Sequence, residues 1–274
     1  MIKRSITGVA TVAVVALVTC SVPPGAIAQS GDAAQIVKSM SNYVARQTNL
    51  SVVFDSDIEV TTPDKQKIQF SSSGKVLLSR PDKFRATRTG GYVDLEMVFD
   101  GTKISLLGKN LNKYVQMQAP GSSEQLVEML RDRFGLDLPG ADLLAPDGYS
   151  QLMADVVDAK YIGRGIIDGI ECEHVAFRTP DVDWQLWVEV GSRPIPRKYV
   201  ITSKNVPGSP QYTLRFRDWK SDVKFKAGTF VFKPPARAQQ VDIAQMRNID
   251  EVPESSVAGQ PEGMNGLSGI GGQQ

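Results

Sequence analysis

From about residue 50 to residue 220, apolar and polar residues alternate in short runs separated by turn-forming residues. The run Tyr92–Phe99 places Val93, Leu95, Met97 and Phe99 on one side and two acidic residues on the other. A period of two is typical of a β-strand with one buried face, because successive side chains of a strand point to opposite faces. This alternation restricts the chain to a mainly β (α+β) fold, in which one face of the sheet is packed and the other contacts water.

Turn signals divide the alternating region into a meander of antiparallel strands. The Asp-Gly pairs at residues 100–101 and 168–169 each separate two alternating runs, which is a strong signal for a β-hairpin. We expect about six strands before residue 120 and about five after residue 155. Gly74 is expected to interrupt the second strand, and a short run at Thr229–Phe232 is expected to close the sheet.

Helical spacing occurs in two places. Before the first strand, apolar residues recur at three- and four-residue spacing: Ile36, Val37, Met40, Tyr43 and Val44. Between residues 120 and 155, Ser122 and Gln125 form a capping-box pattern ahead of a second apolar stripe. We therefore expect an N-terminal helix, and a helical insertion that could cover one face of the sheet.

Residues 1–28 have the layout of a secretory signal peptide. Lys3 and Arg4 give a basic start, residues 9–18 are apolar and uncharged, and residues 26–28 (Ala-Ile-Ala) read as a small-x-small cleavage site. We expect cleavage after Ala28 and a periplasmic protein. The alternative is a lipoprotein signal in which Cys20 is lipidated, although Thr19 occupies a position where a smaller residue is expected.

The remaining chain is expected to form one domain, residues 29–240, followed by a tail. Residues 241–274 are rich in Gly and Gln and are predicted to be disordered, because they carry too little apolar surface to order themselves. No apolar stretch after residue 28 is long enough to cross a bilayer, so we do not expect an integral membrane protein. With 31 Lys and Arg against 30 Asp and Glu, the charge gives no reason to expect a nucleic-acid partner.

The residues that could carry chemistry are few. His174 is the only histidine, and Cys172 is the only cysteine left after cleavage; both face one side of a predicted strand. A Cys-His nucleophile pair is one interpretation, but neighbours along one strand point in parallel, so we expect them to serve packing alone. Acidic pairs such as Asp55 and Asp57 fit a solvated strand face better than a calcium site. We predict no catalytic residue, no metal, no cofactor and no enzymatic activity.

A basic cluster surrounds a predicted turn at residues 81–82. It consists of Arg80, Lys83, Arg85 and Arg88. Such a cluster could hold an anionic headgroup, since guanidinium groups pair well with carboxylates and phosphates. The alternative is a turn followed by the outward face of a strand.

Several short runs carry a family resemblance. Residues 76–85 (VLLSRPDKFR) and 98–103 (VFDGTK) resemble the LolA/LolB-like superfamily of periplasmic carriers. Residues 184–189, 194–198 and 230–235 are similar to a family of predicted periplasmic proteins of unknown function. The resemblance implies an incomplete antiparallel β-barrel of about eleven strands, with helices covering its open side and an apolar cavity between sheet and helices.

The apolar faces of the predicted strands supply candidate ligand-binding residues. They are Phe54, Leu95, Met97, Phe99, Ile104, Leu106, Met117, Trp184 and Leu186. Apolar faces of this kind suit an acyl chain if they surround a cavity, and form a plain core if they do not. We therefore expect a non-enzymatic periplasmic protein that binds a lipid or another lipophilic molecule. The alternative is an envelope protein-interaction or regulatory module with a packed core, which binds a protein partner instead.

Overall fold

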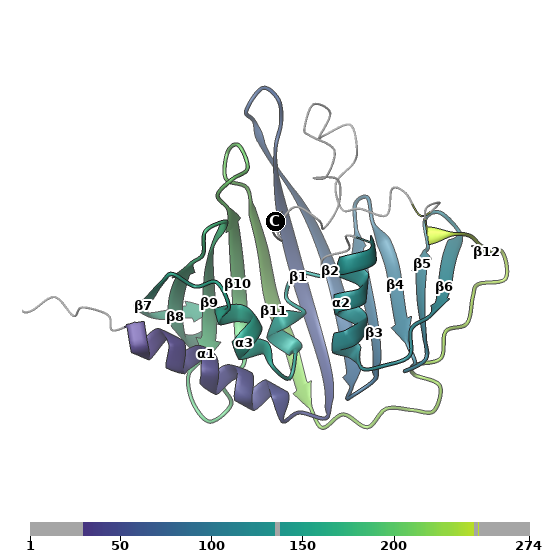
Figure 1. Ribbon diagram of the computed structural model, residues 1–274, viewed down its shortest axis with the longest axis horizontal. Helices are drawn as coiled ribbons and strands as arrows, with labels where there is room; N and C mark the ends of the chain where they lie inside the picture. Colours follow the sequence, from purple (N-terminus) through teal and green to yellow (C-terminus); the bar gives the residue numbers. More distant parts are fainter. Residues whose placement is uncertain (1–29, 135–137, 244–245, 247–274) are drawn as a thin grey trace, which may run out of the picture.

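Twelve strands form one open, strongly curved sheet in the computed structural model, which describes residues 30–134, 138–243 and 246 (Figure 1). The predicted signal peptide, Cys20 and most of the predicted tail lie outside these residues. The strands are β1 (Asn49–Thr61), β2 (Lys67–Ser79), β3 (Lys83–Gly90), β4 (Asp94–Phe99), β5 (Lys103–Gly108), β6 (Lys113–Gln118), β7 (Asp158–Ile167), β8 (Ile170–Arg178), β9 (Val182–Glu189), β10 (Pro196–Ser203), β11 (Gln211–Ser221) and β12 (Gln239–Gln240).

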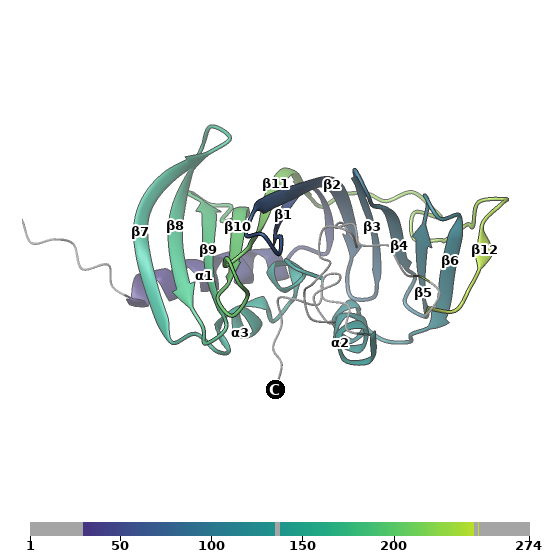
Figure 2. The ribbon, with the colours of Figure 1, turned by 90° about the horizontal axis from the view of Figure 1, so that it is seen from above.

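Two antiparallel meanders join side by side to make this sheet. Its order is β12-β6-β5-β4-β3-β2-β1-β11-β10-β9-β8-β7, so the first strand of the first meander pairs with the last strand of the second. The sheet does not close, since β7 lies at one edge and β12 at the other (Figure 2). The predicted incomplete antiparallel barrel of about eleven strands is confirmed; the twelfth strand, β12, has only two residues and pairs in parallel with β6.

The helices lie along the concave side of the sheet (Figure 2). They are α1 (Ser30–Ala45), α2 (Ser123–Phe134), α3 (Gly148–Met153) and the short 3-10 helix η1 (Asp142–Leu144). The capping box that begins α2 is present as predicted: the backbone N–H of Ser122 donates to Gln125 Oε1 at 2.9 Å, and the N–H of Gln125 donates to Ser122 Oγ at 3.3 Å.

The predicted hairpins also form. Asp168 and Gly169 both have positive φ, at 49° and 79°, which is the backbone conformation that a two-residue hairpin loop between β7 and β8 requires. Asp100 Oδ1 accepts the backbone N–H groups of Thr102 and Lys103, and this fixes the turn between β4 and β5. The sheet register therefore follows from turn residues that are visible in the sequence.

Two sequence-based expectations about element boundaries are wrong. Strand β2 runs through Gly74 without interruption, because Gly74 pairs with Phe54 across the sheet. Thr229–Phe232 is not a strand; this segment instead crosses the outer face, where the Thr229 carbonyl accepts a hydrogen bond from Arg85 Nη1 at 2.8 Å. Beyond residue 240, Met246 is buried in a small cluster with Leu106 and Val115.

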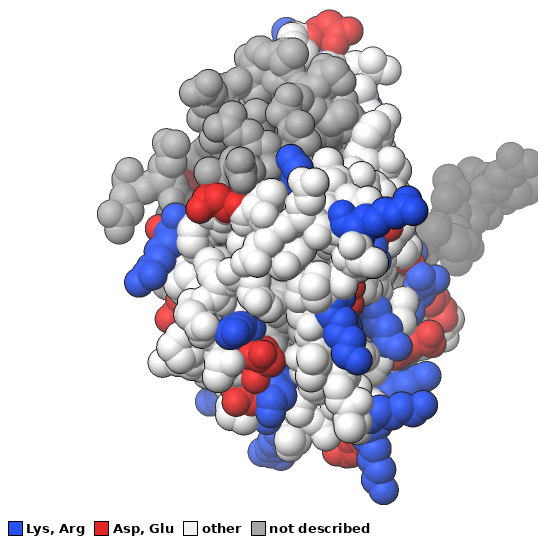
Figure 3. Space-filling view, turned by 90° about the vertical axis from the view of Figure 1, so that its right-hand side faces the viewer, with Lys and Arg blue, Asp and Glu red and all other residues white. Residues whose placement is uncertain are grey.

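The two edges of the sheet differ in character. At the end with β6 and β12, Lys and Arg side chains are interspersed with Asp and Glu around uncharged groups (Figure 3). Charged side chains at an edge disfavour pairing with another sheet. At the opposite edge, β7 exposes Ile162 and Ile166, which are 54% and 65% accessible.

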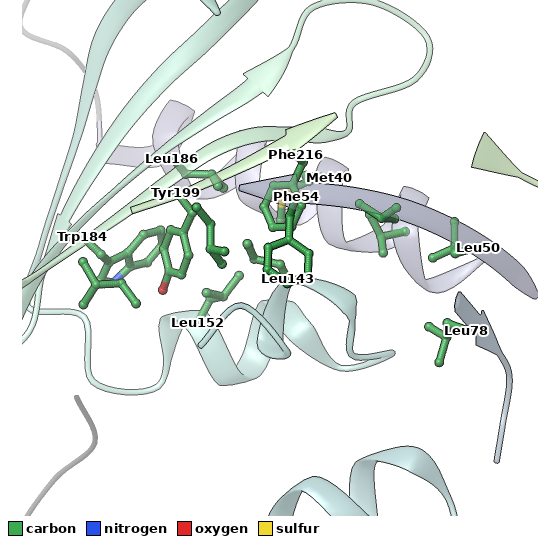
Figure 4. Packing of buried hydrophobic residues seen from close by; sticks show 14 of the residues in the cluster. Met40, Leu50, Phe54, Leu78, Leu143, Leu152, Trp184, Leu186, Tyr199 and Phe216 are labelled. Carbon is green, nitrogen blue, oxygen red and sulfur yellow. The ribbon is translucent and has the colours of Figure 1, made fainter. Parts of the chain in front are cut away.

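The main core lies between the sheet and α1, η1 and α3. Val37, Met40 and Val44 of α1 are completely buried, as the predicted apolar stripe requires. Figure 4 shows Leu143 and Leu152 from η1 and α3 facing Trp184, Leu186 and Tyr199 of the sheet. This half of the molecule, α1, η1 and α3 with β7–β10, is called the packed half below.

Candidate ligand cavity

A cavity of about 360 Å³ lies between the sheet and α2. Its floor comes from β1–β5 and β11, and its opposite wall from α2 and the segment Leu138–Gln151. The lining residues are Phe54, Val76, Leu78, Arg80, Phe84, Ala86, Thr87, Arg88, Leu95, Met97, Leu106, Ser123, Glu124, Val127, Glu128, Arg131, Leu138, Pro139, Gly140, Ala141, Leu144, Ala145, Asp147, Gln151, Leu214 and Phe216. The volume falls within the roughly 300–1,000 Å³ of small-molecule sites. The part of the molecule formed by β1–β6, β11 and α2 is called the hollow half.

The position of α2 decides where the cavity begins. In the antiparallel register, Phe84 lies opposite Phe99, and Phe99 lies opposite Ile104. This row is almost fully buried, in one cluster with Leu126 and Leu130 of α2. Of that row only Phe84 also lines the cavity, whereas the next row, Ala86, Met97 and Leu106, lines it along its whole length. Leu126 and Leu130 of α2 therefore pack against one row of the floor and leave the next row open.

Small residues in the floor give the cavity its depth. Gly74 lies opposite Phe54, and a Cβ atom there would come within 2.3 Å of the Phe54 ring and 2.4 Å of the Thr87 carbonyl oxygen. Only glycine permits this close approach. Ala86 leaves space in the neighbouring strand, so the ring of Phe54 can lie flat against the sheet while the volume above β3 stays open.

The structure brings together part of the predicted ligand-binding set. Phe54, Leu95, Met97 and Leu106 line the cavity. Phe99, Ile104 and Met117 share the adjacent row beside α2 and belong to the core cluster. Trp184 and Leu186 lie in the packed half, where the Trp184 ring stacks on Phe177 with 4.0 Å between ring centroids.

Sequence reasoning did not identify the wall of the cavity. Val127, Glu128 and Arg131 of α2 line it with residues 138–141 and Leu144, together with Leu214 and Phe216 of β11. The alternation of β11 marks Leu214 and Phe216 as inward-facing, and this signal could have found them. Nothing in the sequence shows which side of α2 is left facing a cavity.

The mouth of the cavity is polar. Glu128, Arg131, Asp147 and Gln151 line the cavity and are exposed to solvent. The cavity therefore opens between α2 and the segment that leads into α3 (Figure 1). A polar mouth and an apolar floor form an amphipathic site.

Arg80 ties one end of the cavity together. Its Nε donates to the Gln47 carbonyl at 3.0 Å, its Nη2 donates to the Leu144 carbonyl, and its Nη1 lies 3.5 Å from Glu124 Oε1. Burial lowers the pKa of Arg80, and Glu124 opposes that shift. Ser123 beside it has a buried Oγ with no hydrogen-bond partner among the described residues, so one polar atom in this wall is left available.

Asp142 of η1 is a partly buried acid beside the cavity wall that the segment of residues 138–151 forms. Burial raises the pKa of Asp142 to about 6, while the Leu143 N–H, Arg131 and the Tyr199 hydroxyl act in the opposite direction. The Leu143 N–H donates to Asp142 Oδ1 at 2.9 Å. Burial also raises the pKa of Tyr199, with Asp142 contributing. Asp142 thus links η1, next to the cavity, to the sheet of the packed half.

Cys172 and His174 lie on the outer face of the packed half, away from the cavity. The His174 ring stacks on Trp187 at 4.0 Å, and its Nε2 lies 3.0 Å from Gln185 Oε1. Burial lowers the pKa of His174 and raises the pKa of Cys172 to about 11. The thiol is therefore protonated at neutral pH, which makes it a poor nucleophile.

Within the described ranges, no group of three or more His, Cys, Asp and Glu residues is arranged to hold a metal ion. None of the helices described is both long enough and apolar enough to cross a membrane.

Comparison with known proteins identifies relatives at the level of family. A family model described as "Predicted periplasmic protein (DUF2092)" matches residues 33–244, which confirms the similarity noted in the sequence. No curated protein matches the chain significantly.

Solved structures show weaker likeness. An uncharacterised conserved protein from Thermus thermophilus shares 12% identity at a TM-score of 0.45, covering 78% of this chain and 99% of that one. The Mycobacterium tuberculosis lipoprotein LppX shares 15% identity at 0.44, covering 72% and 99%. A LolA superfamily protein from Nitrosomonas europaea, NE2245, shares 11% identity at 0.34, covering 73% and 97%.

Proposed function

The chain belongs to the DUF2092 family of predicted periplasmic proteins, and from that premise we propose that it is a non-enzymatic binding protein for a lipid or another lipophilic molecule. The observation that carries the proposal is the cavity of about 360 Å³ between the sheet and α2. We further propose that cleavage after Ala28 releases the protein, with residues 29–240 forming the binding domain.

The chemistry of the floor supports a lipophilic ligand. Phe54, Met97 and Leu106 present apolar groups toward the cavity, and, apart from Arg88, the charged lining residues lie at its ends and mouth. Each methylene group that leaves water contributes about 0.8 kcal/mol, so an acyl chain gains binding energy in proportion to its buried length. An empty apolar cavity would forgo that gain and the dispersion contacts of its lining.

Native mass spectrometry of the full mature protein tests the proposal. We expect a co-purifying mass in the range of an acyl-chain compound, and uptake of a fluorescent fatty acid by protein stripped of that compound. Leu106→Glu should abolish uptake, because it places a charge on the cavity floor. Val231→Glu is the matched control, since Val231 is 51% exposed and lies outside the cavity.

Circular dichroism must show that both variants are folded. Unchanged uptake by a folded Leu106→Glu variant would contradict the proposal. Failure of the wild type to bind any of the lipids tried would contradict it as well.

A second candidate function rests on the exposed edge strand. Val157, Ile162 and Ile166 lie along or next to β7 and are more than half exposed. Exposed aliphatic side chains beside an unpaired edge suit the addition of a strand from a partner protein. An envelope interaction module is favoured if the purified protein is empty and a bound periplasmic partner is lost in Ile162→Lys.

A further inference from the structure

Two arginines within or next to the strands of the sheet line the cavity, Arg80 and Arg88, and they lie at different places along its floor. Arg80 follows the end of β2, whereas Arg88 lies within β3, opposite Gly74 on one side and Leu95 on the other. Arg80 is held by two backbone carbonyls and Glu124, so its role is structural. Arg88 is the cation that the floor itself presents beside the apolar row.

Arg88 is positioned by aromatic groups. Its Nη2 donates to the Tyr212 hydroxyl at 2.6 Å, and its guanidinium carbon lies 5.7 Å from the centroid of the Phe54 ring. A cation over an aromatic face is stabilised by the ring quadrupole. Since Gly74 leaves room for the Phe54 ring, the same close approach shapes the cavity and supports the guanidinium.

Polar groups continue beyond Arg88 on the inner face. Ser56 and Ser72 pair across β1 and β2 with 2.7 Å between their hydroxyl oxygens, and both residues are buried. In the other direction along β3 the inner face is apolar, through Ala86 and Phe84. Arg88 therefore marks the boundary between a polar and an apolar stretch of the floor.

We infer that the ligand is an amphiphile with one acyl chain and an anionic headgroup, whose headgroup binds Arg88 and whose chain lies along Ala86, Met97 and Leu106. The inference rests on the proposed function and narrows it. A guanidinium offers a fork of N–H donors that matches a carboxylate or phosphate. An anion taken out of water needs such a partner. The modest volume suits one chain better than several.

The positions of the other charged lining residues are consistent with an anionic headgroup at Arg88. Glu124 is paired with Arg80, and Glu128 and Asp147 lie at the exposed mouth, where water screens them. An anionic headgroup at Arg88 is thus separated from the Arg80–Glu124 pair by the apolar row. Arg131 at the mouth is the competing position for the headgroup, and the experiment must distinguish the two.

Competition against a fluorescent fatty acid provides the test, with three competitors of equal chain length: a fatty acid, the matching fatty alcohol and a lysophosphatidic acid. We expect wild type to bind at least one anionic competitor more tightly than the alcohol. Arg88→Gln should weaken anion binding about tenfold to hundredfold and leave alcohol binding unchanged, whereas Arg88→Lys should retain most of the preference. Arg131→Gln should keep the preference for the anionic competitor, and the exposed surface variant Arg193→Gln is the control expected to match wild type.

Each outcome bears on a separate claim. Preference for the carboxylate or for the phosphate, lost in Arg88→Gln, supports the inference and identifies the source of the anion. Equal binding of acid and alcohol by wild type overturns the inference but leaves the lipophilic cavity intact, as does a preference lost only in Arg131→Gln. Binding of none of the three overturns the proposed function too. Retained alcohol binding shows that Arg88→Gln is folded.

Discussion

The packed half and the hollow half are built on one continuous sheet, yet only one of them is filled. In the packed half, α1 runs across β7–β9 with a stripe of completely buried residues, and η1 and α3 fill the remaining space. In the hollow half, α2 has twelve residues and is buried at Ser123, Leu126 and Leu130. The row of side chains beyond these contacts is left facing the cavity. The contrast shows that helix coverage, together with small residues such as Gly74 in the strands, determines whether an inward face becomes core or cavity.

The largest expected effect compares the same substitution in both halves. Leu186→Ala should lower the free energy of unfolding by about 3–5 kcal/mol, because Leu186 is fully enclosed and its removal leaves a void. Leu95→Ala should cost only about 1 kcal/mol, since Leu95 already borders a cavity. Urea unfolding measures both. Equal losses would mean that the hollow half is packed as tightly as the other.

A pH-dependent effect is expected where the two halves meet. The pKa of Asp142 is raised to about 6, so the folded state holds this proton more tightly than the unfolded chain. Below the unfolded pKa, near 3.8, the carboxyl is protonated in both states and costs nothing. As pH rises from about 3.8 to about 6, the unfolded chain releases the proton while the folded state keeps it, so stability falls; above about 6 the folded state ionises too and the loss is complete.

Asp142→Asn removes that loss while keeping an acceptor for the Leu143 N–H. Relative to wild type, the variant should gain up to about 3 kcal/mol between about pH 4 and about pH 7.5, at about 1.4 kcal/mol per pKa unit. Urea unfolding at both pH values gives the difference. A gain that does not change with pH would show that Asp142 titrates normally.

Gly74→Ala tests the close approach that opens the floor. The added Cβ would overlap the Phe54 ring and the Thr87 carbonyl, so we expect a loss of about 1–3 kcal/mol in unfolding free energy and weaker uptake of the fatty acid. Gly165→Ala is the matched control, because Gly165 is a strand glycine whose Cβ would make only ordinary contact with Trp187 at 3.5 Å. Similar losses in the two variants would indicate a general cost of changing a strand glycine.

The smallest expected effect is a gain. Ala86→Leu extends a side chain into the cavity, so it should raise stability by about 0.5–2 kcal/mol and reduce ligand uptake in parallel. Thermal unfolding and the uptake assay together measure this. A loss of stability would show that the space above β3 is not open.

Much of the fold could be predicted from the sequence, because alternation and turn chemistry are local. The two Asp-Gly hairpins, the capping box of α2 and the eleven long strands all rest on neighbouring residues. The segment at Thr229–Phe232 was misassigned because its run of apolar residues is indistinguishable from a strand. Its place across the outer face depends on Arg85, which is distant in the sequence.

The candidate site was predictable only in part, for the same reason. Alternation identifies Leu95, Met97 and Phe99 as inward-facing, but it cannot show that α2 leaves the first two facing the cavity while Phe99 is enclosed. The same alternation places Arg88 on the inner face of the sheet. Its position beside Phe54 depends on the pairing of β2 with β3 and on Gly74, which are tertiary facts.

The central claim, that a lipophilic ligand occupies the hollow half, is tested most directly by quenching tryptophan fluorescence with a brominated fatty acid. The ring centroid of Trp219 lies 6.2 Å from that of Phe216, which lines the cavity, whereas Trp184 lies in the packed half. Variants that keep only one of the chain's three tryptophans, with phenylalanine at the other two positions, report on each half separately. The account predicts strong, saturable quenching of Trp219 and little of Trp184. Saturable quenching of Trp184 without quenching of Trp219 would contradict it.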